Sequence, residues 1–282
     1  MPTVRTRPPA VAGQFYAEEA GALTQEIERS FLDVRGPGRL PPRHRSPDRT
    51  LRAIVVPHAG YQYSGPIAAL AYEEVARERP PGTVLILGVD HHGAGAAAAV
   101  SDVPWRTPLG PVETDHGLVK ALDVEPVEID EAAHAPEHSI EVQLPFLQYV
   151  LPHPRIVALM VRHGPWSFLS EVAARVRTAL QGRDVLLVAS TDFSHYVPPS
   201  VADRLDHLAI DRILARDARG LFDVVEGEEI SMCGIAPTTV LLAALAGEPL
   251  TTRLLRWGHS GEAERMGRVV GYAALTMSTA PA

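Results

Sequence analysis

The chain has 282 residues, with 26 Lys and Arg against 34 Asp and Glu, so its formal net charge is −8. A hydrophobic fraction of 46% is typical of a globular rather than a disordered protein, and a single cysteine excludes a scaffold held by internal disulfides. The acidic balance argues against a nucleic-acid-binding protein, no apolar run approaches the roughly 20 residues that span a bilayer, and no secretory signal is visible. We therefore expect a cytoplasmic protein that binds neither nucleic acid nor membrane.

The predicted elements alternate along the chain. Residues 35–50 are rich in Pro, Gly and Arg, which predicts a surface loop inside one domain spanning residues 1–282 rather than a linker between two domains. Apolar runs without alternation predict four strands covered on both faces, at residues 53–56, 83–87, 155–161 and 184–189. Helical spacing predicts helices at residues 67–79, 139–151, 168–180, 201–216 and 237–245.

This order predicts an α/β fold. Its centre would be a mostly parallel or mixed β-sheet flanked by helices on both faces. Residues 96–114 break the alternation and predict a β excursion with a turn at Thr107–Gly110, which would add an antiparallel edge to the sheet.

Histidines follow the predicted strands. His58 follows the first strand, His91 and His92 the second, and the fourth is followed by Asp192 and His195. The carboxyl ends of parallel strands form the ligand crevice of open α/β sheets, so these side chains should share one edge. Imidazole is the commonest metal ligand and general base near neutral pH, which favours a functional site over ordinary hydrogen-bonded loop histidines. At most one of the adjacent His91 and His92 is expected to face that site, since successive side chains of an extended segment point in opposite directions.

Two further segments allow two interpretations each. His138 lies near a predicted helix start, where free N–H groups favour an anionic ligand, but Ser139 and nearby carboxylates would also make an ordinary helix cap. Cys233 precedes another predicted helix, where a thiolate would be stabilised, although a lone cysteine is usually a small buried hydrophobic residue.

Several motifs occur in a fixed order over nearly the whole chain. They are RPPAVAGQFY near the start, PHAGYQYSGPIAALAY at 57–72, LILGVDHH at 85–92, WRTPLG at 105–110, EHSIEVQLPFLQY at 137–149, STDFSHY at 190–196 and MCG at 232–234. In these motifs the chain resembles the Memo family, which includes AmmeMemoRadiSam system protein B. It departs from the common family pattern at Val89 and Asp90, where Pro and Ser are usual, and Asp90 could add a carboxylate near the site or orient a neighbouring histidine.

The resemblance implies a fold like that of the class III extradiol dioxygenases, which use non-haem iron. It implies the metal ligands His58, His91 and Cys233, with Cys233 standing where the dioxygenases keep a carboxylate. His195 matches their acid/base position, His138 matches another pocket histidine and Asp192 lies beside it, and these three are the expected catalytic residues. The remaining residues expected around the pocket are Tyr61, Asp90, His92, Glu141 and Tyr196.

Two histidines and a thiolate form a soft ligand set that favours copper or zinc and still accepts iron. The sequence therefore predicts an iron- or copper-dependent oxidoreductase of unknown substrate. One alternative is a non-catalytic protein whose pocket binds a small molecule or a peptide, with Tyr61, Tyr63, Trp105 and Tyr196 lining a groove. Another is a zinc-dependent hydrolase. The family name also implies a functional link to radical-SAM and AMMECR-type proteins.

Overall fold

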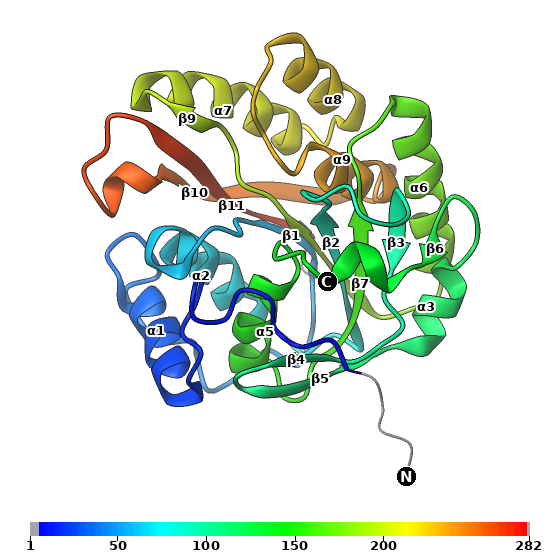
Figure 1. The fold of residues 1–282 in the computed structure, drawn as a ribbon, viewed down its shortest axis with the longest axis horizontal. Coiled ribbons are helices and arrows are strands. Elements are labelled where there is room, and N and C mark those ends of the chain that lie inside the picture. Colours follow the sequence, from blue (N-terminus) through cyan, green and yellow to red (C-terminus); the bar gives the residue numbers. More distant parts are fainter. Residues whose placement is uncertain (1–5, 281–282) are drawn as a thin grey trace.

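The computed structural model describes residues 6–280 and contains an 11-stranded sheet with helices on both sides (Figure 1). The strands are β1 (Leu51–Val56), β2 (Thr83–Val89), β3 (Ala98–Val100), β4 (Trp105–Thr107), β5 (Gly110–Thr114), β6 (Glu128–Ile129), β7 (Arg155–Val161), β8 (Val185–Ser190), β9 (His195–Val197), β10 (Leu250–His259) and β11 (Val269–Thr279). The helices are α1 (Ala20–Leu32), α2 (Tyr61–Arg77), α3 (His116–Leu122), α4 (Glu131–His134), α5 (Leu144–Val150), α6 (Trp166–Ala179), α7 (Pro199–Leu214), α8 (Ala218–Gly227) and α9 (Ile235–Ala244), with 3-10 turns η1 (Glu141–Gln143) and η2 (Ser260–Glu262).

The centre of the sheet is parallel. Strands β1, β8, β2 and β7 lie side by side in that order, and they correspond to the four buried strands predicted from the sequence. Strand β11 pairs antiparallel with β1 and with β10, while β3 pairs antiparallel with β7. The sheet is therefore mixed, and the β excursion at 96–114 supplies part of its antiparallel edge, as predicted.

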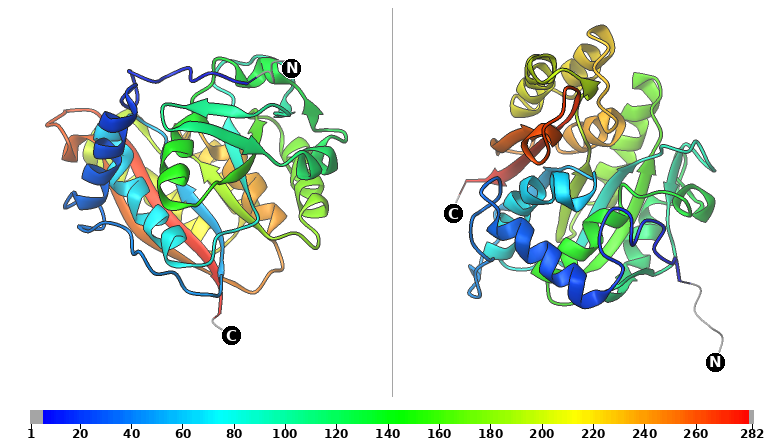
Figure 2. Two further views of the ribbon diagram at one scale, coloured as in Figure 1. Left: turned by 90° about the horizontal axis from the view of Figure 1, so that it is seen from below. Right: turned by 60° about the vertical axis from the view of Figure 1, so that its left-hand side comes forward.

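Both faces of the central strands are buried. Ile54 and Val56 of β1 pack into a core with α1, α2 and α5, whereas Ala53 and Val55 pack into a second core with α6, α7 and α9. Successive side chains of a strand point to opposite faces, so an uninterrupted apolar run is what a sheet covered on both sides requires. The two groups of helices lie on opposite sides of the sheet in Figures 1 and 2.

Two of the five predicted helices begin more than two residues from the predicted start. Helix α2 begins at Tyr61, not at residue 67, because the helix accommodates Pro66, and the side chain of Arg35 reaches the carbonyl of Gln62 at 3.5 Å, one turn before that proline. The segment predicted as a helix from residue 139 begins instead as η1 and α5. Ser139 does not cap it, since its hydroxyl bonds the backbone N–H and C=O of Val89 at 3.0 Å each.

Residues 35–50 contain no helix or strand, as predicted. None of the helices within residues 6–280 has the length and apolar character needed to cross a bilayer.

Candidate metal centre

The carboxyl ends of three adjacent parallel strands carry three of the predicted site residues. His58 follows β1, Asp192 follows β8 and His91 follows β2, and these strands are neighbours in the sheet. His163, which follows β7, instead lies on the surface with its Nε2 3.2 Å from Glu226. The strand order thus brings together residues that are far apart in the sequence.

His58 is held in one tautomer by a buried serine. Its Nδ1 lies 3.0 Å from the hydroxyl of Ser190, which donates its own proton to the carbonyl of Ser139 at 2.6 Å and accepts from the Gln143 amide at 2.8 Å. With that proton committed, Ser190 accepts from the His58 Nδ1–H, and the lone pair of the neutral ring is on Nε2. This nitrogen lies 3.2 Å from the sulfur of Cys233. Burial, reinforced by nearby histidines, lowers the pKa of His58 well below its usual value, which keeps the ring neutral.

Cys233 approaches the site from the segment just before α9. Gly234 allows this approach, since a Cβ atom there would lie 2.2 Å from the Cβ of Thr191, and its N–H donates to the Thr191 hydroxyl at 3.1 Å. The sulfur accepts the backbone N–H of Asp192 at 3.3 Å. Burial of the sulfur, with the Asp192 carboxyl nearby, raises the pKa of the thiol. The thiol therefore stays protonated unless a cation stabilises the thiolate.

His91 stands opposite His58, with the two ring centroids 5.4 Å apart. Its Nδ1 and its backbone N–H each lie 2.9 Å from a carboxylate oxygen of Glu137. Burial would raise the pKa of Glu137, but hydrogen bonds from His91 and other N–H groups outweigh it, so the pKa is lowered. The ligand atoms of His58, His91 and Cys233 all lie within 4.8 Å of one another.

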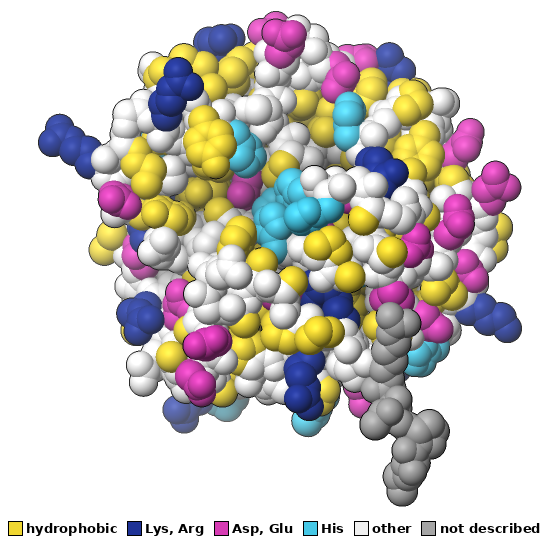
Figure 3. Space-filling view, viewed as in Figure 1, with side chains coloured by type: hydrophobic (Ala, Val, Ile, Leu, Met, Phe, Trp, Pro, Cys, Tyr) yellow, Lys and Arg dark blue, Asp and Glu magenta, His cyan; other side chains and the backbone are white. Residues whose placement is uncertain are grey.

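His138 completes a group of three imidazoles. Its ring stacks on that of His91 at 4.7 Å, lies 5.4 Å from that of His58, and is covered by Phe15 at 4.7 Å. Burial lowers its pKa to about 4, so the ring is neutral at physiological pH. Figure 3 shows histidine side chains gathered near the middle of one face of the molecule.

Asp192 and His195 lie beside this group. Asp192 is 4% exposed and its Oδ1 accepts the backbone N–H of His58 at 2.8 Å, while burial raises its pKa. The Nδ1 of His195 lies 2.8 Å from the carbonyl of Ser231, which can only accept, so the neutral ring keeps its lone pair on Nε2. Tyr196 is 69% exposed with a φ of 57°, an uncommon backbone conformation for an aromatic residue. His195 is not part of the close ligand group.

Two residues expected around the pocket make other contacts. The hydroxyl of Tyr61 donates to the carbonyl of Val142 at 2.6 Å within the core. The carboxylate of Glu141 is fully buried and binds Arg7 and the hydroxyl of Tyr16, each at 2.6 Å. Both side chains thus support the surrounding structure.

The polar residues in the loop after β2 face different surroundings. Asp90 pairs with Arg162 at 2.6 Å through one oxygen, and its other oxygen accepts the backbone N–H groups of His92 and Gly93 at 3.2 and 2.8 Å, whereas the side chain of His92 is exposed. Of the two adjacent histidines, His91 therefore faces the other imidazoles. Trp105, suggested as a groove residue, is 1% exposed and donates to the Ser101 hydroxyl at 3.1 Å.

The sequence reasoning missed Glu137, Ser190 and Gln143 as residues that orient the histidines. Glu137 belongs to the EHSIE motif, where it was considered only as part of a helix cap, and Ser190 opens the STDFSHY motif. Their position beside predicted site histidines was the available signal.

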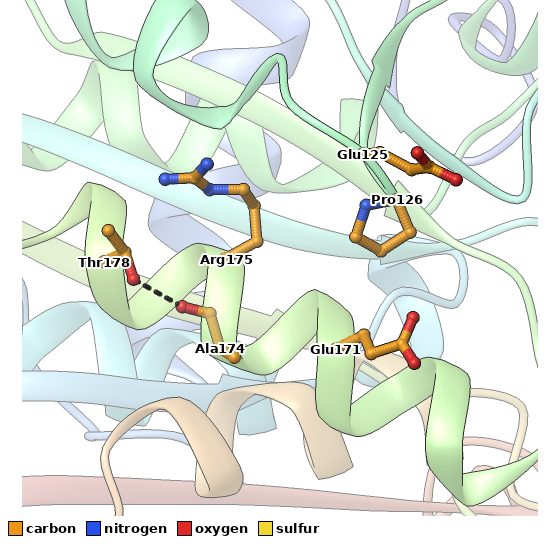
Figure 4. Close-up of a pocket in the computed structure, with 6 residues that line it drawn as sticks. All are labelled: Glu125, Pro126, Glu171, Ala174, Arg175 and Thr178. Carbon is orange, nitrogen blue, oxygen red and sulfur yellow. Dashed lines mark hydrogen bonds between the residues drawn. The ribbon is translucent and has the colours of Figure 1, made fainter.

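A separate surface hollow lies between α6 and the loop that precedes β6 (Figure 4). It is lined by Glu125, Pro126, Glu171, Ala174, Arg175 and Thr178. Within α6, the Thr178 hydroxyl donates to the Ala174 carbonyl at 3.0 Å. The lining includes no histidine or cysteine, so the hollow is not part of the candidate metal centre.

Comparisons with known proteins agree with the motifs. A family model for Memo-like proteins matches residues 7–276. The MEMO1 family protein MK0963 of Methanopyrus kandleri is 42% identical over 95% of this chain and 98% of its own length, and MTH_45 of Methanothermobacter thermautotrophicus is 39% identical over 96% and 99%. The crystal structure of the Escherichia coli K12 protein JW3007 is similar with a TM-score of 0.51 and 15% identity over 80% of this chain and 99% of that chain, a similarity of fold alone.

Proposed function

The chain belongs to the family of Memo-like proteins, and on this premise we propose that it is a metal-dependent oxidoreductase whose ion is held by His58, His91 and Cys233. The observation that supports this most is the mutual approach of the three ligand atoms to within 4.8 Å, with Cys233 Sγ only 3.2 Å from His58 Nε2. Side chains from three distant segments meet there with their ligand atoms turned toward one another.

The chemistry of these groups fits a transition-metal ion. His58 is neutral with its lone pair on the nitrogen that faces Cys233, as an imidazole ligand must be. The thiol of Cys233 is a weak acid in this setting, and a bound cation would displace its proton. Two imidazoles and a thiolate suit copper, iron and zinc. Iron or copper in this set would supply redox chemistry, whereas zinc would supply only Lewis acidity.

The proposed substrate side of the centre is the partly exposed side, where His91 and His195 reach solvent. The neutral ring of His195 has its lone pair on Nε2, where it can accept a proton from a substrate hydroxyl, and Asp192 and His138 adjoin the same group. A small molecule or an exposed segment of a peptide could enter from this side.

Metal content and O2 consumption together test the proposal. Protein purified without chelator under reducing conditions should contain iron or copper, and His58→Ala and Cys233→Ala should lose it. His195→Ala should keep the metal but lose the metal-dependent O2 uptake that the wild-type protein shows with a panel of catechols and other reductants.

Three results would contradict the proposal. Equal iron and copper binding by wild type and the two ligand variants would refute the ligand assignment. Metal binding without any metal-dependent O2 uptake would favour a non-catalytic ligand-binding protein. Hydrolysis of ester or amide substrates restored by zinc, but not by iron or copper, would identify a hydrolase instead.

A further inference from the structure

A buried carboxylate lies between two histidines of the site, one that follows β2 and one that precedes η1. We propose that Glu137 is the positioning residue of the candidate metal centre, fixing the tautomer of His91 and the turn that carries His138. The inference deepens the proposed function and rests on it, because it concerns how one proposed ligand is prepared for metal.

Glu137 contacts His91 at two points, the backbone N–H and the ring. One carboxylate oxygen accepts the backbone N–H of His91 and the other lies against its ring Nδ1, both at 2.9 Å. A carboxylate can only accept hydrogen bonds, so the proton of the neutral ring is on Nδ1 and the lone pair is on Nε2. Ligand histidines commonly donate their second ring N–H to such a carboxylate, which fixes the ring and raises its basicity.

The same carboxylate also organises the next turn. Its Oε1 accepts the backbone N–H groups of His138 at 2.8 Å and Ser139 at 2.9 Å, and it lies 3.2 Å from the ring Nδ1 of His138. Glu137 is 1% exposed, so water cannot replace these contacts. One side chain thus bonds the ring of His91 and the backbone that carries the ring of His138, and the planes of these two stacked rings differ by only 15°.

Glu137 could instead be a metal ligand, since Glu137, His91 and His138 also place ligand atoms within 4.8 Å of one another. The hydrogen bonds favour the positioning role. Three backbone N–H groups already point at its two oxygens, which leaves these oxygens facing donors. Asp90, the other acidic residue in this loop region, is engaged by Arg162 and cannot orient His91.

The first test uses the metal-free protein. Long-range ¹H–¹⁵N spectra report which nitrogen of each histidine carries the proton. We expect the Nδ1–H tautomer of His91 in the wild-type protein and its loss in Glu137→Ala. Glu137→Gln keeps one acceptor oxygen and should retain the tautomer in part. Glu131→Gln is the matched control. The Glu131 carboxylate accepts the backbone N–H of Asp102 at 2.7 Å and the hydroxyl of Ser101 at 2.8 Å, but it contacts no histidine.

The second test is titration with Co²⁺, followed by its sulfur-to-cobalt absorption band. Loss of the group that orients a ligand histidine typically weakens metal binding by about 10- to 100-fold. We expect a loss of about 10-fold in Glu137→Gln and about 100-fold in Glu137→Ala, with wild-type affinity in Glu131→Gln. If Glu137→Ala does not fold, the Co²⁺ affinity of Glu137→Gln carries the test, because this variant is expected to keep the tautomer in part.

The outcomes separate this inference from the proposed function. Wild-type tautomer and wild-type Co²⁺ affinity in the Glu137 variants would overturn the positioning role. Two Co²⁺ per chain in the wild type, with one lost and the sulfur-to-cobalt band unchanged in Glu137→Ala, would also overturn it and make Glu137 a ligand. If the wild-type protein binds no Co²⁺, the proposed function fails, and the His91 tautomer of the metal-free protein still decides whether Glu137 sets it.

Discussion

The protonation of each histidine depends on what its ring touches. His134 is fully buried, and its Nε2 contacts the carbonyl of Ala99 at 3.1 Å. Burial lowers its pKa from 6.5 to about 4, Arg7 adds to this effect, and Asp130 and Glu137 oppose it only partly. The neutral ring is thus required by the folded protein, whereas the unfolded chain imposes no such requirement.

This requirement predicts acid sensitivity. As the pH falls from 6.5 toward 4, the unfolded chain protonates His134 while the folded protein does not, so folding stability is lost across that range. At pH 5 the loss from this residue is about 2 kcal/mol. His134→Gln should therefore lose less free energy of unfolding between pH 7 and pH 5 than the wild-type protein, as measured by urea denaturation.

His58 and His138 also have lowered pKa values. Both residues are present in the wild-type protein and in His134→Gln, so their contributions to the pH dependence cancel in this comparison. An equal loss of stability in wild type and variant would show that His134 is not kept neutral by the fold.

Residues 7–16 form a segment without helix or strand, and one buried carboxylate holds this segment against the rest of the fold. Glu141 accepts hydrogen bonds from Arg7 at 2.6 Å and Ala10 at 2.7 Å with one oxygen, and from Tyr16 at 2.6 Å and Val11 at 3.0 Å with the other. Removing one partner of a buried, hydrogen-bonded ion pair leaves the other charge uncompensated. The segment should therefore depend strongly on this side chain.

Glu141→Gln should lower the free energy of unfolding by about 3 kcal/mol and speed amide exchange in residues 7–16. The substitution should also affect the candidate metal centre, because the ring of Phe15 in the same segment packs on the ring of His138 at 4.7 Å. Hydrogen exchange followed by mass spectrometry makes the measurement, with Glu131→Gln as control. Wild-type protection of residues 7–16 in the Glu141 variant would mean that apolar contacts, not Glu141, hold the segment.

At the scale of the whole molecule, the four central parallel strands were predicted, whereas β11, which pairs with β1, and the edge strand β10 were not. The four central strands are apolar along nearly all their length because both faces are covered. Strand β10 is only partly buried and carries Arg253 and Arg256, so it lacks such a run. Its pairing with β11 is determined by tertiary contacts that local pattern does not reveal.

The candidate site was predictable to a similar degree. The strand-end argument grouped His58 and His91, since parallel strands share an edge. The role of Cys233 came only from the family resemblance, because the cysteine lies 175 positions from the histidine it contacts. The role of Glu137 escaped prediction because it depends on hydrogen bonds to a residue 46 positions away.

The central claim is that His58, His91 and Cys233 bind one metal ion together. X-ray absorption of zinc-loaded protein tests it most directly, because zinc–sulfur and zinc–nitrogen distances differ clearly, at about 2.3 and 2.0 Å. We predict one sulfur and two imidazoles around the ion, and loss of the sulfur in Cys233→Ser. A shell of nitrogen and oxygen alone in the wild-type protein, or a sulfur signal that persists in Cys233→Ser, would contradict the claim.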